Sequence, residues 1–278
     1  MFFKYMRATL LILLVGLFFS SCSQYQKVLR GEDTGLKYSM ADSLYNKGKY
    51  KKALQLMEQI VPAYRGKPQA EKLMFMYANT FYNLEDFYLA GYQFERFETS
   101  YPKSDSVEVA SYRSAKSYYQ LSPRYSLDQK DTDKALEKLQ EFIDKYPNSE
   151  YRLGINDLVS ELRYKKEKKE FEIAKQHLKT AEALGSWRPA IAAFDNFISD
   201  NPGSPFRKEA FYLRFVAAYE LAINSVPQLV DQRLEEAKGY YNSFTKYYKD
   251  SDLKADADKI SEEIEKRLNS NKETTSLN

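Results

Sequence analysis

An alanine recurs along this chain, and each time a tyrosine or asparagine follows it eleven residues later. An apolar or aromatic residue also stands four and seven residues after each alanine. The five alanines are Ala53, Ala90, Ala135, Ala190 and Ala237. A recurring unit predicts a stack of similar supersecondary elements, because each copy buries its apolar face against its neighbours. Arrays of this kind bind other proteins more often than they catalyse reactions.

The apolar residues within one copy follow the period of an α-helix. One helix is predicted within Leu36–Asn46 and a second within Lys51–Ala63, with a short turn at Gly48 between them. This helix-turn-helix unit resembles the tetratricopeptide repeat, which has a small residue where helix B packs on helix A. A larger side chain there would push the two helix axes apart. The predicted fold is all-α, a superhelical solenoid of about five such repeats over residues 36–268.

The recurring alanines are 37, 45, 55 and 47 residues apart. The consensus repeat has 34 residues, so we expect insertions. One is a polar loop over residues 122–132. Another is a long helix, or two abutting helices, within 148–179. The third surrounds Pro227 over residues 224–233, and the polar residues 269–278 are predicted to form a flexible tail.

The N-terminus has the pattern of a processing signal. Basic Lys4 and Arg7 precede an apolar run over residues 8–19, and small residues precede Cys22. The run is shorter than the roughly 20 residues of a spanning helix. It resembles a bacterial lipobox, which predicts a signal peptide over 1–21 and a lipid on Cys22. The alternative is an ordinary secretory signal beside an incidental cysteine.

The predicted lipid is an S-diacylglycerol on the thiol and an N-acyl chain such as palmitate on the new amino group. Several acyl chains anchor a protein stably where one is marginal. Ser23 follows Cys22, which by the bacterial sorting pattern favours the outer membrane. We therefore expect a protein anchored by lipid at the periplasmic face of that membrane, with residues 22–35 as a linker to the folded part.

Composition argues against several function classes. The 42 basic and 39 acidic residues nearly balance, which gives no electrostatic reason to expect nucleic-acid binding. One histidine (His177), one cysteine and the absence of phosphate-loop or hydrolase motifs predict no enzyme, no metal and no cofactor besides the lipid. His177 and Trp187 are expected to pack between helices. Paired carboxylates remain numerous enough for a hydrolase to stay an alternative.

In such an array, the helix-A residues outside the packing stripe line the concave face. Aromatic rings interleaved with amides suit an extended peptide, because rings accept its side chains and amides bind its backbone. The predicted substrate-binding residues of the first two repeats are Tyr38, Asp42, Tyr45, Asn46, Lys72, Phe75, Asn79, Tyr82 and Asn83. The alternative is that several of these rings only pack between repeats.

The runs Phe142–Tyr151, Trp187–Ile191 and Asn201–Ser204, together with the lipoprotein start, resemble the BamD/ComL family of outer-membrane assembly lipoproteins. The resemblance implies a non-enzymatic scaffold and substrate receptor of the β-barrel assembly machinery. Its partners would be the POTRA domains of the barrel subunit and unfolded barrel proteins with aromatic C-terminal signals. The resemblance also implies a partner-binding basic residue at Lys208, beside Arg207.

Two other functions remain open from the sequence. One is a generic periplasmic adaptor of the same repeat type in envelope or peptidoglycan-linked complexes. Such adaptors usually carry a coiled coil, and this chain has no sustained heptad run. The other is a glycan-binding or glycan-active lipoprotein. Binding sugars would need exposed stacking tryptophans, and the chain has one tryptophan.

Overall fold

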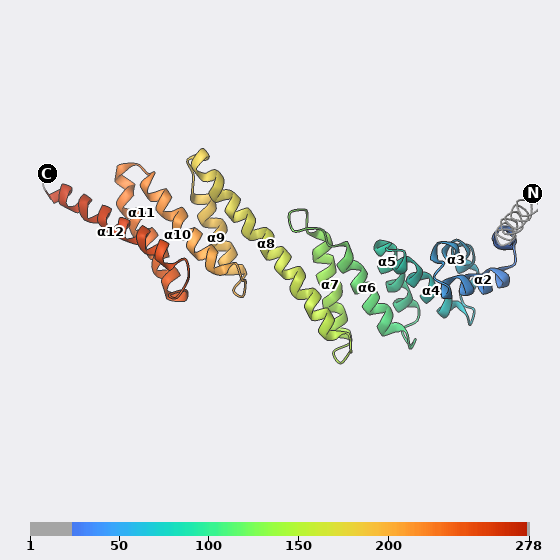
Figure 1. The fold of residues 1–278 in the computed structure, drawn as a ribbon. Coiled ribbons are helices and arrows are strands. Elements are labelled where there is room, and N and C mark those ends of the chain that lie inside the picture. The colour runs from blue at the N-terminus through green and yellow to red at the C-terminus, as the bar shows by residue number, and fades with distance from the viewer. Residues whose placement is uncertain (1–23, 277–278) are drawn as a thin grey trace, which may run out of the picture. The chain divides into compact units, whose positions relative to one another are not determined.

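The structure, a computed structural model, describes residues 24–276, with side chains through Ser270. Helices fill most of this range, and no strand occurs within it. The helices are α2 (Thr34–Asn46), α3 (Tyr50–Tyr64), α4 (Ala70–Asn83), α5 (Phe87–Ser100), α6 (Val107–Leu121), α7 (Lys130–Lys145), α8 (Arg152–Leu184), α9 (Arg188–Asp200), α10 (Arg207–Ile223), α11 (Pro227–Tyr247) and α12 (Lys254–Ser276) (Figure 1). The pairs α2/α3, α4/α5, α6/α7, α8/α9 and α10/α11 are the five predicted repeats.

The recurring alanines have the role that the sequence predicts. Each lies on the second helix of its pair, near the start in the first four repeats and in the middle of α11 in the fifth, and all five are fully buried: Ala53, Ala90, Ala135, Ala190 and Ala237. The residues seven positions later are buried as well, as Phe97, Phe142 and Phe244 illustrate. The all-α fold of tetratricopeptide-like repeats is therefore confirmed. The methyl side chains of these alanines let the two helices of each pair approach closely.

The turns inside the first two repeats share one backbone conformation. Gly48 has φ +67°, and Lys49 N donates to Leu44 O at 2.8 Å. Glu85 lies 37 residues later with φ +61°, and Asp86 N donates to Phe81 O at 3.0 Å. These left-handed residues end helix A and let helix B begin at once. Glycine suits this position, whereas Glu85 adopts it against the preference of a residue with a Cβ atom.

The chain divides into two compact units. Unit 1 comprises residues up to Pro123 and 130–159, and unit 2 comprises residues 124–129 and those from Ser160 onward. Each has its own apolar core. In unit 1 the core runs from Tyr25 to Ala110 and combines alanine with methionine and phenylalanine. In unit 2 it runs from Phe171 to Leu268 and is built mainly of alanine and phenylalanine.

The three predicted insertions take different forms. The loop between α6 and α7 covers residues 122–129, so it is shorter than expected. The long segment before the fourth repeat is a single helix of 33 residues, α8, which settles the choice between one helix and two. The expected insertion around Pro227 is largely helical. Proline stands at the start of α11 and extends that helix to 21 residues, because its fixed φ suits a first helical turn.

Both ends of the described range differ from the sequence-based expectation. The predicted linker over 22–35 contains a helix over residues 24–30, and its Tyr25 is buried against the core of unit 1. Tyr25 Oη donates to Gln55 Oε1 at 2.6 Å and contacts Lys52 O at 3.2 Å. At the other end, α12 continues through Ser276 into the predicted tail. The predicted signal peptide and Cys22 lie outside the described residues.

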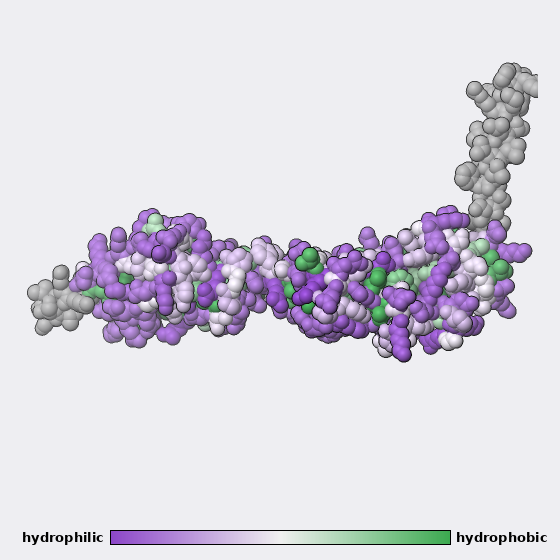
Figure 2. All heavy atoms as spheres, turned by 90° about the horizontal axis from the view of Figure 1, so that it is seen from below, coloured by the Kyte–Doolittle hydropathy of each residue, from purple (hydrophilic) through white to green (hydrophobic). Residues whose placement is uncertain are grey.

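Trp187 is buried, as predicted, whereas His177 is exposed on α8 and not packed as expected. Within residues 24–276, no helix is both long enough and apolar enough to cross a membrane. The face drawn in Figure 2 is mostly hydrophilic, and its hydrophobic residues are scattered rather than gathered in one large patch.

Candidate functional site

The first helices of repeats one to three present one face, which we call the A-face. It comprises the nine predicted residues Tyr38, Asp42, Tyr45, Asn46, Lys72, Phe75, Asn79, Tyr82 and Asn83, and also Arg113. These residues belong to α2, α4 and α6 of unit 1. The buried Ala41, Ala78 and Ala115 mark equivalent positions, each 37 residues after the last. The spacing is set by packing on the second helices.

A chain of polar groups runs across the A-face. Asn79 Nδ2 donates to Tyr45 Oη, and Arg113 Nη1 donates to Asn79 Oδ1. Both pairs are separated by 34 residues, so one amide connects three successive repeats. Asn79 is buried, and burial of an amide is tolerated when its hydrogen bonds are made. Asn79 therefore aligns neighbouring repeats and is not available to a peptide backbone.

An ion pair joins the first two repeats a little further along the A-face. Lys72 Nζ lies 2.8 Å from Asp42 Oδ1. The hydrogen bond with Asp42 raises the pKa of Lys72 and outweighs the opposing effect of burial. Lys72 is exposed and Asp42 is partly covered, so solvent screens the pair and its contribution to stability is small. The pair still neutralises these two charges on the A-face.

The four predicted rings are half-buried because each packs on the second helix of its own repeat. The Tyr38 ring stacks on the Tyr64 ring, with centroids 5.3 Å apart. Tyr45 lies edge-on to Tyr50 at 5.7 Å. In the second repeat, Phe75 contacts Phe97 at 5.4 Å and Tyr82 contacts Phe87 at 5.7 Å. Each ring thus stabilises its repeat and retains some exposed surface.

The remaining amides differ from Asn79. Asn46 and Asn83 are exposed at the C-terminal ends of α2 and α4. Asn83 Nδ2 donates to Asn79 O at 2.6 Å, and the rest of this side chain is exposed to solvent. Of the predicted amides, these two are the ones whose exposure suits contact with a peptide backbone.

Arg113 is the A-face residue that sequence reasoning missed. Its guanidinium carbon lies 5.8 Å from the Phe75 ring centroid and 5.9 Å from that of Tyr82. The residues 37 and 74 positions earlier are Met76 and Ser39, so the repeat pattern gives no sign of a cation here. Arg113 lies 34 residues after Asn79, whereas equivalent positions of these repeats are 37 residues apart. Arg113 therefore lies about one helical turn before the position equivalent to Asn79, and this spacing was the available signal.

The predicted partner-binding residues lie in unit 2, at the start of α10. The Arg207 guanidinium carbon lies 4.9 Å from the Phe211 ring centroid and 5.6 Å from that of Tyr247. Lys208 Nζ lies 2.6 Å from Asp252 Oδ1. The hydrogen bond from Lys208 lowers the pKa of Asp252 below its usual range. Lys208 therefore has an acidic partner within the chain, and that pair is exposed.

Comparison with known proteins places this chain among bacterial outer-membrane proteins. The family model YfiO, described as "Outer membrane lipoprotein", matches residues 32–185, more than half of the chain. An outer membrane protein assembly factor BamD from Caulobacter vibrioides is 29% identical over 125 residues, covering 45% of this chain and 39% of that protein. The BamD of Helicobacter pylori is 31% identical over 68 residues, covering 24% of this chain and 31% of that protein.

This chain therefore spans well under two thirds of either relative's length. Among solved structures, the TPR2AB-domain:pHSP90-complex of yeast Sti1 has a TM-score of 0.39 and 12% sequence identity, covering 84% of this chain and 98% of that one. The family match includes the whole A-face, whereas Arg207 and Lys208 lie beyond it. The match confirms the resemblance that the sequence motifs indicate. The chain belongs to the YfiO family of outer membrane lipoproteins.

Proposed function

We propose that this protein is a non-enzymatic scaffold and substrate receptor of the outer-membrane β-barrel assembly machinery. It binds unfolded barrel proteins on the A-face and the POTRA domains of the barrel subunit near Arg207 and Lys208. The observation that carries the proposal is the family match over residues 32–185, which contains every A-face residue. Both named relatives are outer membrane protein assembly factors.

The chemistry of the A-face supports a role in receiving peptides. Half-exposed rings alternate with exposed amides at Asn46 and Asn83, which suits a chain with aromatic side chains and unpaired backbone groups. Within the A-face, Asp42 neutralises Lys72, and Arg113 has a neutral amide as its hydrogen-bond partner. The A-face as defined thus has a net charge of +1, which favours the carboxylate at the end of an unfolded barrel chain.

The start of α10 supports docking of a second protein. The Arg207 guanidinium lies over two aromatic rings, and Tyr247, one of them, exposes 56% of its surface. Arginine and tyrosine are enriched among the residues that contribute most to protein interfaces. The Lys208–Asp252 pair is exposed, so an acidic residue of a partner would compete with Asp252 for this lysine at little cost.

The helix over residues 24–30 supports an anchor close to the folded part. Cys22 precedes the buried Tyr25 by three residues, a reach of about 10 Å in an extended chain. If Cys22 is acylated, the bilayer surface lies near the first repeat and not at the end of a long tether. The lipid then holds unit 1 at the periplasmic face of the outer membrane.

Purification of the full-length protein from gently solubilised outer membranes tests the assembly role. We expect a POTRA-bearing barrel protein to co-purify, together with a diacylated N-terminus detected by mass spectrometry. Retention on the membrane should be lost when Cys22 is replaced by serine. Absence of any POTRA-bearing protein from the purified complex would remove the proposal in favour of a general periplasmic adaptor.

Photocrosslinking to the C-terminal segments of nascent barrel proteins tests the A-face separately. We expect Tyr45→Ala with Phe75→Ala to reduce the crosslinks, because these changes remove two half-exposed rings. Tyr88→Ala with Tyr92→Ala is the matched control, since both tyrosines are exposed on α5 outside the A-face. Far-UV helicity and the melting temperature must be compared, because Phe75 also packs on Phe97.

Arg113→Gln adds a variant that preserves all the rings. It should weaken crosslinking to a free C-terminus more than to a C-terminally amidated peptide. Equal crosslinking by the wild type, the two double variants and Arg113→Gln would exclude the A-face as the receptor site, even if the POTRA-bearing partner co-purifies.

A further inference from the structure

Units 1 and 2 contain equivalent three-helix segments, and the sequence numbering makes the comparison simple. Residues of α5 and α6 correspond to residues of α9 and α10 one hundred positions later, as Phe94 and Phe194 show. Residues of α7 correspond to residues of α11 102 positions later, as Phe142 and Phe244 show. All four phenylalanines are fully buried or nearly so. The same packing frame therefore occurs twice, with different side chains around it.

In unit 2, an arginine occupies the space between the three helices. Arg214 of α10 is buried, and its Nη1 lies 2.5 Å from Asp195 Oδ1 of α9. Its guanidinium carbon lies 4.8 Å from the Phe211 ring centroid and 4.5 Å from that of Tyr240 on α11. A carboxylate and two aromatic rings form a favourable environment for a guanidinium group.

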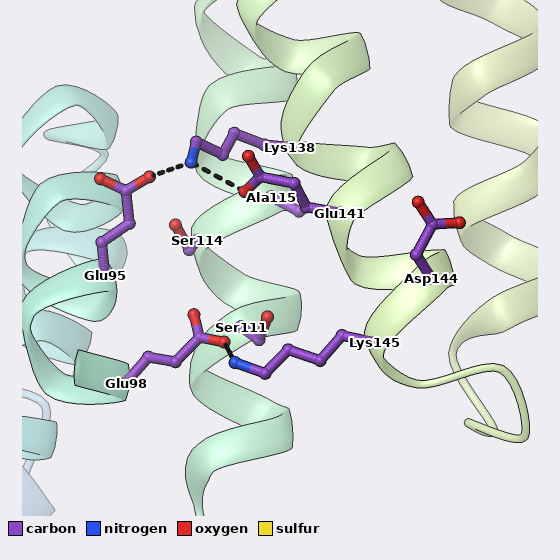
Figure 3. A pocket seen from close by; sticks show the side chains of 9 residues that line it. All are labelled: Glu95, Glu98, Ser111, Ser114, Ala115, Lys138, Glu141, Asp144 and Lys145. Atoms are coloured by element: carbon purple, nitrogen blue, oxygen red, sulfur yellow. Dashed lines mark hydrogen bonds and ion pairs between the residues drawn. The ribbon is translucent and has the colours of Figure 1, made fainter. Parts of the chain in front are cut away.

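In unit 1, the equivalent α6 residues are small, and Lys138 of α7 supplies the cation that pairs with the α5 carboxylate Glu95. Ser114 stands where Arg214 stands in unit 2, Ser111 replaces Phe211, and the carboxylate Asp195 has its counterpart in Glu95. A cavity of about 490 Å³ lies at this place, between α5, α6 and α7. Figure 3 shows the two serines behind it, with Glu95 and Glu98 on one side and the α7 residues on the other.

The lining of this cavity is acidic overall. Four carboxylates, Glu95, Glu98, Glu141 and Asp144, surround it with two ammonium groups, Lys138 and Lys145. Lys138 bridges Glu95 and Glu141 at 2.8 Å each, and Lys145 pairs with Glu98. Burial acts against the charge of Lys138, but the bonds to Glu141 and Glu95 outweigh it, so the pKa of this lysine is raised. The lining therefore has a net charge of −2.

A second feature also indicates an absent ligand group. Ser111 is more than nine-tenths buried and lines the cavity, yet its hydroxyl group has no hydrogen-bond partner among the described residues. Ser114, in contrast, donates to Gly91 O at 3.2 Å. The Ser111 hydroxyl group can therefore donate to, or accept from, a polar group that enters the cavity.

We propose that the cavity between α5, α6 and α7 is a docking site for an arginine side chain of a partner protein. The guanidinium enters the space that Arg214 fills in unit 2, and its charge is balanced by the carboxylates of α5 and α7. Arginine fits better than lysine because its planar group offers five donors to oxygens on two sides. This site is distinct from the A-face and from the start of α10, so it is independent of the function proposed above.

A short capped peptide tests the site on the full-length chain. The probe is acetyl-Gly-Arg-Gly-amide, titrated into the isotope-labelled protein while amide chemical shifts are recorded. Acetyl-Gly-citrulline-Gly-amide is the neutral control of the same shape. We expect saturable shifts at α5, α6 and α7 with the arginine peptide and none with citrulline, and the affinity should fall as salt is added. Equal shifts with both peptides would overturn the proposal, as would no saturable shift with either.

Two variants place the probe in the cavity. Ser114→Arg should fill the cavity from within, as Arg214 does in unit 2, and abolish the shifts, whereas Ser43→Arg on the exposed surface of α2 should leave them. Glu98→Gln with Asp144→Asn should weaken binding about threefold to fivefold. Glu150→Gln with Asp157→Asn is the matched control for lost charge. Unchanged affinity in the Glu98 and Asp144 double variant would contradict the proposal even if Ser114→Arg fails to fold.

Discussion

Arg113 Nη1 on α6 donates a hydrogen bond to Asn79 Oδ1 on α4, 34 residues earlier in the chain. The other end of the same amide donates to Tyr45 on α2. Replacing Asn79 by alanine leaves the Tyr45 hydroxyl and the Arg113 guanidinium without this partner in a partly buried place. We expect the free energy of unfolding to fall by about 1–3 kcal/mol, measured by urea denaturation.

Asn46→Ala is the control for this prediction. Asn46 is exposed at the end of α2, and surface substitutions of this kind usually change stability by less than about 0.5 kcal/mol. If Asn79→Ala lowers the free energy of unfolding no more than Asn46→Ala does, the Asn79 amide does not hold the first three repeats in register.

The recurring alanine allows a test within a single helix. Ala53 and Ala63 both lie on α3, but Ala53 is fully buried and Ala63 is exposed. Ala53→Leu forces three more carbon atoms into a filled contact between α2 and α3, which should cost about 1–3 kcal/mol. Ala63→Leu should leave the midpoint of thermal unfolding nearly unchanged. Similar midpoints for both variants would show that close helix approach does not require the small residue.

Much of the fold follows from local sequence patterns. The positions of the buried alanines, and of the apolar residues four and seven positions later, set the register of every second helix. Pro227 lies in the third predicted insertion and begins α11, since proline is common at the first turn of a helix. The helix over residues 24–30 had no such local signal. It is held by Tyr25, whose partners Lys52 and Gln55 are 27 and 30 residues away.

The candidate site was only partly predictable, because its contacts also join residues that are far apart in the sequence. Periodicity places Tyr38, Phe75 and Tyr82 on one face of their helices, but it does not tell how much of each ring is covered by the second helix. Contacts between repeats depend on the exact stagger of neighbouring helices. Arg113 contacts Asn79 and Lys208 contacts Asp252 across 34 and 44 residues, and neither pair has a sequence signature.

The exposed pair at the start of α10 has a measurable effect on titration. The hydrogen bond from Lys208 lowers the pKa of the Asp252 carboxyl group. Lys208→Met removes that bond, so the pKa of Asp252 should rise toward the ordinary value of about 3.9, as followed by carboxyl-carbon NMR. Lys249→Met, an exposed lysine close by in the sequence, should leave it unchanged.

The direction of the stability change follows from this shift. A carboxyl group whose pKa is lowered by folding stabilises the folded state at a pH above its unfolded pKa. The stabilisation is lost as the pH falls through the lowered, folded-state pKa. Asp252 is fully exposed, so we expect the difference between wild type and Lys208→Met to be small and to disappear in acid. A difference that grows in acid would contradict the pairing.

The buried Tyr25 gives a final test of how the N-terminal segment meets the first repeat. Its ring packs into the core of unit 1 and its hydroxyl contacts Gln55 and Lys52. Tyr25→Ala should therefore release residues 24–30, and their backbone amides should exchange hydrogen faster while those of α5 keep their protection. Gln26→Ala is the control, because Gln26 is exposed on the same helix. Unchanged exchange in Tyr25→Ala would mean that another contact holds this helix, and equal acceleration in Gln26→Ala would mean that the helix is stabilised by its own propensity and not by docking.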